Sequence, residues 1–151
     1  AILLSNKSVL VHGDYSPKNF IVHQGNLILL DFEVAHYGHP VFDLAFMLNH
    51  LFLKSIHDSL SRDVYFQAVS EYLHEYGQFV QGNPLLSKYS NEDCKELLIH
   101  LGCLMLARID GKSPVEYIVD PNVQGRVRFI AKEIISGKCS DILSVMNLIS
   151  Q

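Results

Sequence analysis

The segment from Val41 to Leu53 constrains the fold most, because it is apolar on almost every side. Its apolar residues include Phe42, Leu44, Ala45, Phe46, Met47, Leu48, Leu51 and Phe52. A helix without a polar face has to be surrounded by other elements. The segment therefore predicts a helix at the centre of a domain. A chain of 151 residues, 48% of them hydrophobic, is long enough to build one such core.

Further helices are predicted by residues that begin or end helices. Ser or Asp commonly caps a first turn, Pro suits the first helical position, and Gly commonly ends a helix. A short helical turn is also expected at Ser113-Pro114 with Glu116. The other signals are Ser61 before a helix that Gly77 ends, Ser90 with Asp93 before a helix that ends near Gly111, Asp120-Pro121 before a helix that Gly137 ends, and Ser140 before the last helix.

The front of the chain predicts strands beside a polar loop. Residues 9–11 are β-branched or apolar and lead into His12-Gly13-Asp14. Two apolar runs, 20–22 and 27–30, are separated by His23-Gln24-Gly25-Asn26, which indicates a hairpin. The predicted fold class is α+β, mostly helical, with one small hairpin next to the loop.

Charge and composition exclude several classes of protein. The formal net charge is −4, and only 12 Lys and Arg residues are scattered along the chain. Nucleic acid and anionic membrane surfaces both require clustered cations, so neither is expected as a partner. No apolar run reaches the roughly 18 residues that a membrane span needs. The three cysteines lack a C-x-x-C spacing, which suits a reducing compartment. We expect a cytoplasmic protein.

A group of polar residues near the start of the sequence has a spacing that indicates a particular reaction. The run His12-Gly13-Asp14 to Asn19 reads H-G-D-Y-S-P-K-N, and the hairpin then ends at Asp31-Phe32-Glu33. Protein kinases have H-R-D-x-x-x-x-N followed by D-F-G. Phosphoryl transfer needs a carboxylate that accepts the proton of the attacking hydroxyl, and oxygen ligands for Mg²⁺. This spacing predicts a phosphotransferase; Asp14 alone would be an ordinary turn residue.

Residues 12–45 resemble the aminoglycoside phosphotransferase and choline kinase superfamily, the small-molecule relatives of protein kinases. Besides H-G-D-x-x-x-x-N, the similarity includes Leu30-Asp31-Phe32-Glu33 and the run from Gly38 to Asp43-Leu44. Gly13 in place of the kinase Arg favours the small-molecule branch. The resemblance implies that residues 1–151 form the C-terminal catalytic and acceptor-binding lobe of a protein-kinase-like fold, with ATP and Mg²⁺ as cofactors.

The resemblance also implies roles for single residues. Asp14 is the expected catalytic base, Asn19 and Asp31 are the expected Mg²⁺ ligands, and Glu33 is a further candidate ligand to metal or water. His12 and Asp43 are expected to support the catalytic loop. A buried carboxylate at Asp43 has to be satisfied, and the family pattern has it accept hydrogen bonds from that loop.

Four more charged residues are weaker candidates for substrate or phosphate contact. Lys18 lies in the loop, where a solvated lysine is as reasonable an interpretation. Arg108, Asp110 and Lys112 cluster at a predicted helix end, where cations also interact favourably with the helix dipole. Both interpretations stay open for this cluster.

An ATP-binding first lobe is not expected within these residues. The nine glycines contain no G-x-G-x-x-G. We therefore expect an N-terminal nucleotide-binding lobe to be absent from this chain, and an exposed inter-lobe surface that could form a homodimer. The alternative is a degenerate lobe that acts as a non-catalytic binding module. The small-molecule acceptor stays open among aminoglycosides, choline, ethanolamine, homoserine and methylthioribose, and the net acidity weakly favours a cationic amine.

Overall fold

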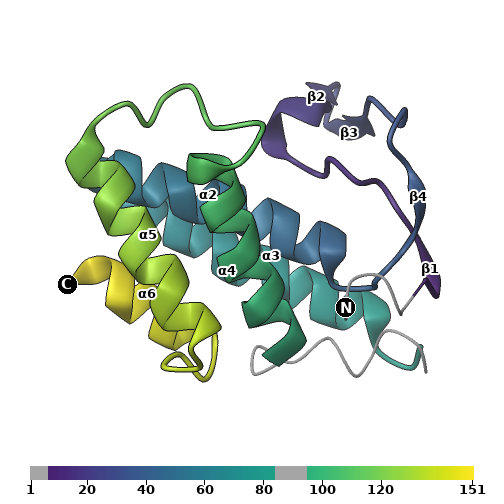
Figure 1. Cartoon of the computed structure of the whole chain (residues 1–151). Helices are drawn as coiled ribbons and strands as arrows, with labels where there is room; N and C mark the ends of the chain where they lie inside the picture. Colours follow the sequence, from purple (N-terminus) through teal and green to yellow (C-terminus); the bar gives the residue numbers. More distant parts are fainter. Residues whose placement is uncertain (1–6, 84–94) are drawn as a thin grey trace.

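The computed structural model describes residues 7–83 and 95–151 as a mostly helical α+β domain (Figure 1). Its α-helices are α2 (Phe42–His57), α3 (Arg62–Val80), α4 (Lys95–Asp110), α5 (Pro121–Ile135) and α6 (Ile142–Ser150). Short strands and the polar loop lie at one side of these helices. None of the helices in the described ranges is long and apolar enough to cross a membrane.

The apolar segment forms the central helix, as predicted. Helix α2 packs against α3, α4 and α5, and its side chains Leu44, Leu48 and Phe52 are fully or almost fully buried. It continues past Leu53 to His57, where the N–H of Asp58 still donates to the carbonyl of Lys54 at 2.8 Å. The prediction of a buried core helix is confirmed.

Two of the other helix signals are confirmed. Asp120 caps α5, because its carboxylate accepts the N–H of Asn122 at 2.8 Å. Helix α5 ends at Ile135, two residues before Gly137, and α4 ends at Asp110 beside Gly111. The predicted capping box at Ser90 and Asp93 lies outside the described residues.

Two of the signals for α3 differ from the prediction. Ser61 precedes α3 but its side chain makes no capping bond, because Asp58 accepts the N–H groups of Leu60 and Ser61 and forms the short 3₁₀ helix η2 (Ser59–Ser61). Gly77 does not end α3. The helix continues to Val80, whose side chain is buried, and burial of this kind outweighs the ~1 kcal/mol that glycine costs in a helix.

The signals at Ser140 and Ser113 were also wrong. Asp141, not Ser140, caps α6: its carboxylate accepts the N–H of Ser144 at 2.6 Å, and the Ser144 hydroxyl completes a capping box. The segment around Ser113 forms a bend at residues 111–113 and a turn at residues 116–117 instead of a helix. There Val115 is buried against the core, and its N–H donates to the carbonyl of Arg108 at 2.9 Å.

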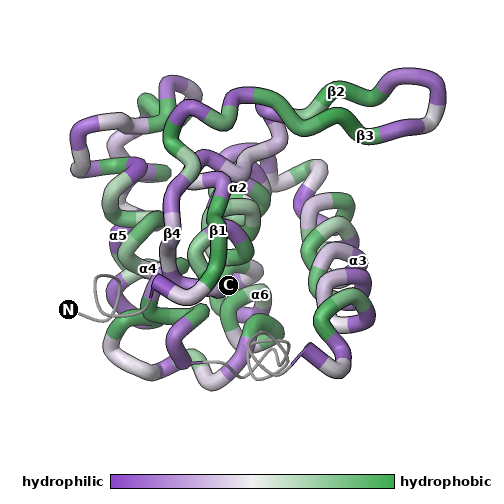
Figure 2. The backbone as a smooth tube through the Cα atoms, turned by 90° about the vertical axis from the view of Figure 1, so that its right-hand side faces the viewer, coloured by the Kyte–Doolittle hydropathy of each residue, from purple (hydrophilic) through white to green (hydrophobic). Residues whose placement is uncertain are grey.

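The predicted hairpin is present. Strands β2 (Phe20–His23) and β3 (Asn26–Leu29) are antiparallel, with Phe20 opposite Leu29. The two turn residues both have positive φ, 49° at Gln24 and 78° at Gly25, which is the backbone conformation of a type I′ turn. Figure 2 shows this apolar hairpin extending away from the helices.

A second strand pair was only half predicted. Strand β1 (Val9–Val11) forms as expected, and it pairs antiparallel with β4 (His36–Gly38). The sequence of β4, His-Tyr-Gly, has no alternation that indicates a strand, so its conformation is set by pairing with β1. This pairing brings the chain after Asp31 back alongside the segment that enters the polar loop.

Candidate active site

Asp43, in the first turn of α2, holds the start of the polar loop. Its two carboxylate oxygens accept the backbone N–H groups of His12 at 2.6 Å and of Gly13 at 3.0 Å. The structure thus brings Asp43 to the loop that the sequence analysis associated with it. A single carboxylate satisfies two backbone donors that the turn leaves without a backbone partner.

Replacing Asp43 should therefore destabilise the fold. We expect Asp43→Ala to lower the free energy of unfolding by about 1–3 kcal/mol, the cost of leaving buried donors unsatisfied. Asp43→Asn is the matched control, because its amide oxygen can still accept one N–H, and it should cost less. Urea unfolding monitored by circular dichroism measures both. Identical midpoints for the wild type and Asp43→Ala would show that these bonds contribute nothing.

His12 connects the loop to the end of the hairpin. Its Nδ1 accepts the N–H of Asp14 at 3.3 Å, and its Nε2 donates to the carbonyl of Leu30 at 2.8 Å. These two partners require a neutral ring protonated on Nε2. The N–H of Leu30 also donates to the carbonyl of Asn19 at 2.9 Å. The buried imidazole thereby fixes Asp31, the next residue, beside the loop.

Gly13 is required by both conformation and space. Its φ is +86°, and a Cβ built on it would lie 2.7 Å from the carbonyl oxygen of Val34. Because the segment that contains Val34 follows Asp31, a side chain at this position would push that segment away from the loop. The absence of a side chain at Gly13 therefore allows the segment after Asp31 to lie close to the loop that contains Asp14.

A pair of glycine substitutions separates the two effects. Gly25 also has a positive φ, +78°, but nothing lies within 4 Å of its Cβ position. We expect Gly25→Ala to cost roughly 1 kcal/mol, the conformational penalty alone, and Gly13→Ala to cost clearly more. Thermal unfolding of both variants measures the difference. Equal costs would show that the contact with Val34 does not matter.

Asp14 and Lys18 form an ion pair within the loop. The Lys18 Nζ lies 2.8 Å from the Asp14 carboxylate, and the Asp14 side chain is 23% exposed. Burial by itself would raise the pKa of Asp14, but hydrogen bonds from Lys18 and Asn19, together with the positive charge of Lys18, outweigh it and hold the pKa below its ordinary value. Asp14 is consequently an ionised, accessible carboxylate at neutral pH.

Asn19 is buried on the other side of Asp14. Its Nδ2 donates to the backbone carbonyl of Asp14 at 2.8 Å, and the residue ends the 3₁₀ turn η1 (Pro17–Asn19). This bond uses the amide nitrogen and not the amide oxygen, which is the atom that a cation binds. Asn19 therefore combines support of the backbone at Asp14 with a potential oxygen ligand.

A cavity of about 280 Å³ brings the predicted acidic residues together. Asp14, Asp31 and Glu33 line it, with Lys18 and Arg108 among the other lining residues. Asp31 has a φ of +64°, a conformation that Asp tolerates better than most residues. The sequence analysis thus named Asp14, Lys18, Asp31, Glu33 and Arg108 of this cavity, but Asn19, also named as a ligand, is not among its lining residues.

The donor set of this cavity fits Mg²⁺. Within the described ranges, no three His, Cys, Asp or Glu side chains come together as a closed metal cage. Mg²⁺ does not require one, since it usually binds one or two protein carboxylates and completes its octahedron with water and substrate phosphates. Asp31 and Glu33 are exposed carboxylates on the cavity wall, and the Asn19 amide lies next to Asp14.

A larger cavity of about 570 Å³ adjoins the first and includes residues that the sequence analysis missed. His50 and Lys54 of α2 line it, together with Arg108 and Tyr117, and Lys18 and Ser113 line both cavities. A signal was present in the sequence. His50 and Lys54 are one helical turn apart on an otherwise apolar helix, so they lie on the same face.

The cluster at the end of α4 separates in the structure. Arg108 lines both cavities. Asp110 instead pairs with Arg128 of α5, with Nη2 2.7 Å from Oδ1. Lys112 is exposed and lines neither of the two cavities. Asp110 and Lys112 therefore do not face the site, because the last turn of α4 directs Arg108 inward and Asp110 toward α5.

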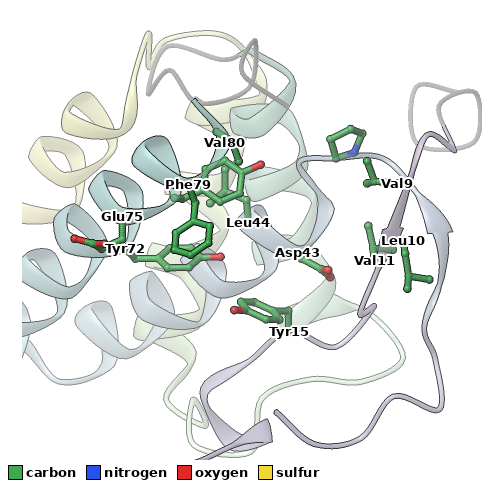
Figure 3. Close-up of a pocket in the computed structure, with 12 residues that line it drawn as sticks. Val9, Leu10, Val11, Tyr15, Asp43, Leu44, Tyr72, Glu75, Phe79 and Val80 are labelled. Carbon is green, nitrogen blue, oxygen red and sulfur yellow. The ribbon is translucent and has the colours of Figure 1, made fainter. Parts of the chain in front are cut away.

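A third cavity, of about 430 Å³ and mostly apolar, lies between β1 and α3 (Figure 3). Tyr72 and Phe79 face it from α3, Val9 and Leu10 from β1, and Asp43 from the start of α2. Asp43 thus borders this groove with the same carboxylate that accepts the N–H groups of the polar loop.

Comparison with known proteins identifies a family for this chain. A family model described as the phosphotransferase enzyme family matches residues 2–79, which include the loop, the hairpin, α2 and most of α3. No curated protein matches the sequence significantly. The matched region is more than half of the chain and contains Asp14, Asn19, Asp31 and Asp43. The chain therefore belongs to the phosphotransferase enzyme family, the aminoglycoside phosphotransferase and choline kinase superfamily that its loop motif resembles.

Proposed function

We propose that this chain is the catalytic lobe of an ATP-dependent kinase that transfers the γ-phosphoryl group to a hydroxyl of a small molecule. One observation carries the proposal. The loop after β1 and the end of the β2–β3 hairpin meet so that Asp14, Asp31 and Glu33 line the same cavity. A proton-accepting carboxylate beside oxygen ligands for Mg²⁺ is the arrangement that this reaction uses.

The roles follow from the position of each side chain. The acceptor hydroxyl oxygen attacks the γ-phosphorus, the bond from that phosphorus to the β–γ bridging oxygen breaks, and the hydroxyl proton passes to the Asp14 carboxylate. Asp31 and Asn19 would hold Mg²⁺, with Glu33 as a further ligand to metal or water. When bound, Mg²⁺ supplies positive charge to the phosphate oxygens.

Lys18 is positioned to contribute charge to the same step. Its Nζ, 2.8 Å from the Asp14 carboxylate, lies where a transferred phosphoryl group would approach the base. The long side chain is 62% exposed, so it can turn from Asp14 to a phosphate oxygen. The ion pair thus keeps a cation next to the proposed base.

We propose that a nucleotide-binding lobe, which is not seen in residues 7–83 and 95–151, completes the site. The surface around the hairpin supports this, because large apolar side chains are exposed there. They are Ile21, Val22, Leu27 and Ile28 of the hairpin with Phe32, Val34 and Tyr37 beyond it. Exposed apolar surface of this extent usually marks an interface. A second copy of this chain could cover it instead, and sedimentation of the 151-residue chain would reveal such a dimer.

Phosphoryl transfer can be tested directly in protein that carries the nucleotide-binding lobe. Purified protein is mixed with Mg-ATP and a panel of amines, sugars and hydroxy acids, and ADP release is measured together with the mass of the acceptor. We expect acceptor-dependent ADP release with a gain of one phosphate on the acceptor. No ATP consumption with any acceptor, in protein that binds ATP, would favour the non-catalytic binding module.

A further inference from the structure

The larger cavity next to the catalytic loop concentrates positive charge. Lys18 of the loop, Lys54 of α2 and Arg108 of α4 all line it. Glu116 is the acidic residue among the lining side chains, and it is exposed. The local charge of this cavity is therefore opposite in sign to the net charge of the chain, −4.

Two of these cations lack an anionic partner. Lys18 is paired with Asp14, but neither Lys54 nor Arg108 has a carboxylate partner among residues 7–83 and 95–151. Arg108 donates instead to the carbonyl and hydroxyl oxygens of Ser113, and the Lys54 Nζ lies 5.2 Å from the centre of the Tyr117 ring. Uncompensated cations on a cavity wall attract an anionic ligand.

Several buried polar atoms at this cavity also have no hydrogen-bond partner in the described part of the chain. They are Nε2 of His50, Nε of Arg108 and the hydroxyl of Tyr117. His50 is only 6% exposed. Buried polar groups are nearly always hydrogen-bonded to protein or to ordered water, so these three groups leave hydrogen-bonding capacity at the cavity for water or a polar ligand.

The protonation states make this set rich in donors. Burial, followed by the charge of Arg108, lowers the pKa of His50 to about 4, so its imidazole is neutral at pH 7. Burial raises the pKa of Tyr117 to about 12, so its hydroxyl keeps its proton. The Tyr117 hydroxyl, the Arg108 guanidinium and the Lys54 ammonium therefore all present N–H or O–H donors, which suit the oxygens of an anion.

We propose that the phosphate acceptor carries a carboxylate or phosphate group in addition to its hydroxyl, and that Lys54, Arg108 and Tyr117 bind this anionic group. The inference rests on the proposed function. Lys18, Arg108 and Ser113 line both cavities, so an acceptor anchored in the larger cavity can present its hydroxyl to Asp14 in the smaller one. A cationic amine, which the net charge weakly favours, would be repelled by Lys54 and Arg108 in this cavity, and the net charge averages over the whole surface.

Four small alcohols that differ in charge test the proposal. Glycerate carries a carboxylate, glycerol 3-phosphate carries a phosphate, glycerol is neutral, and choline is cationic. Binding of each to the lobe-bearing protein is measured by isothermal titration calorimetry at constant ionic strength without ATP. The same measurement is made for Lys54→Met and Tyr117→Phe, with Lys95→Met as matched control because Lys95 is exposed at the opposite end of α4 from Arg108.

We expect at least one anion to bind about tenfold or more tightly than glycerol and choline, a factor that corresponds to one charge-assisted hydrogen bond. Lys54→Met and Tyr117→Phe should each remove most of this preference, and Lys95→Met should keep it. Whether glycerate or glycerol 3-phosphate binds better distinguishes a carboxylate from a phosphate. Tighter binding of choline or glycerol, no binding of either anion, or unchanged affinity in the two cavity variants would overturn the proposal.

Turnover separates failure of this inference from failure of the proposed function. The acceptor panel is repeated with Mg-ATP and ADP release is measured. If the anions bind through Lys54 and Tyr117 but no acceptor is phosphorylated, the anion site stands and the kinase proposal is wrong. If choline or a neutral sugar is phosphorylated and the anions are not, the kinase proposal stands and the acceptor class is wrong.

Discussion

Asp14→Asn should lower kcat by about 100- to 10,000-fold, the range that a positioned general base contributes. The amide has nearly the shape of the carboxylate but cannot accept the proton of the attacking hydroxyl. The backbone of the loop should not move, because Asn19 still donates to the main-chain carbonyl of Asp14 in the variant. We therefore expect a large loss of kcat with an unchanged melting temperature and unchanged ATP affinity.

The measurement is steady-state ADP release in lobe-bearing protein with an acceptor identified from the panel. Asp63→Asn is the matched control, since Asp63 is an exposed carboxylate in the first turn of α3, and it should retain normal kcat. A near-normal kcat for Asp14→Asn would remove Asp14 from the catalytic role, even though its place in the cavity would be unchanged.

Loss of the Asp31 carboxylate should raise the Mg²⁺ concentration needed for half-maximal rate by more than about tenfold. Removing a residue that only hydrogen-bonds to a metal ligand typically lowers metal affinity 10- to 100-fold. Removing a ligand that contacts the metal directly should lower it by at least tenfold. Asp31→Asn is the informative substitution, because Asp31 has a φ of +64° and Asn tolerates that conformation whereas Ala is strained there. Asn19→Ala should raise the Mg²⁺ requirement less, since it removes a neutral ligand.

Mg²⁺ titrations of the two variants at saturating ATP and acceptor measure the difference. Melting temperatures have to be compared at the same time, because the Asn19 amide also supports the backbone at Asp14. A half-maximal Mg²⁺ concentration that is the same for Asp31→Asn and the wild type would contradict the assignment of Asp31 as the main ligand.

Family membership and site geometry support these predictions in different ways. The family match covers residues 2–79 and implies phosphotransferase chemistry without assigning an acceptor. The segment around Arg108 and Tyr117, which lines the larger cavity, lies beyond the match. The chemistry therefore rests on the front of the chain, and the acceptor class rests on residues that only the structure connects to it.

The sequence by itself determined the parts of this protein that depend on local order. The run from His12 to Asn19 with Asp31 predicted the acidic cavity because the spacing within a loop and a hairpin is set by short chain segments. The turn at Gln24-Gly25 and the apolar helix α2 could likewise be predicted, since each is specified by its own residues. The ends of the helices were predicted less accurately. Gly77 signalled an end that burial of Val80 overrode, and the caps at Asp58 and Asp141 depended on competition between neighbouring side chains.

Only the tertiary structure decided which distant residues meet the loop. Strand β4 forms because β1 pairs with it, and Gly13 is required because Val34 passes 2.7 Å from its Cβ position. Arg108 and Asp110 are two residues apart, yet one faces the site and the other binds Arg128, because α4 packs between α2 and α5. The same packing places Lys54 and Tyr117 beside Lys18. No local pattern encodes such a cavity, since its charge arises from side chains that separate elements bring together.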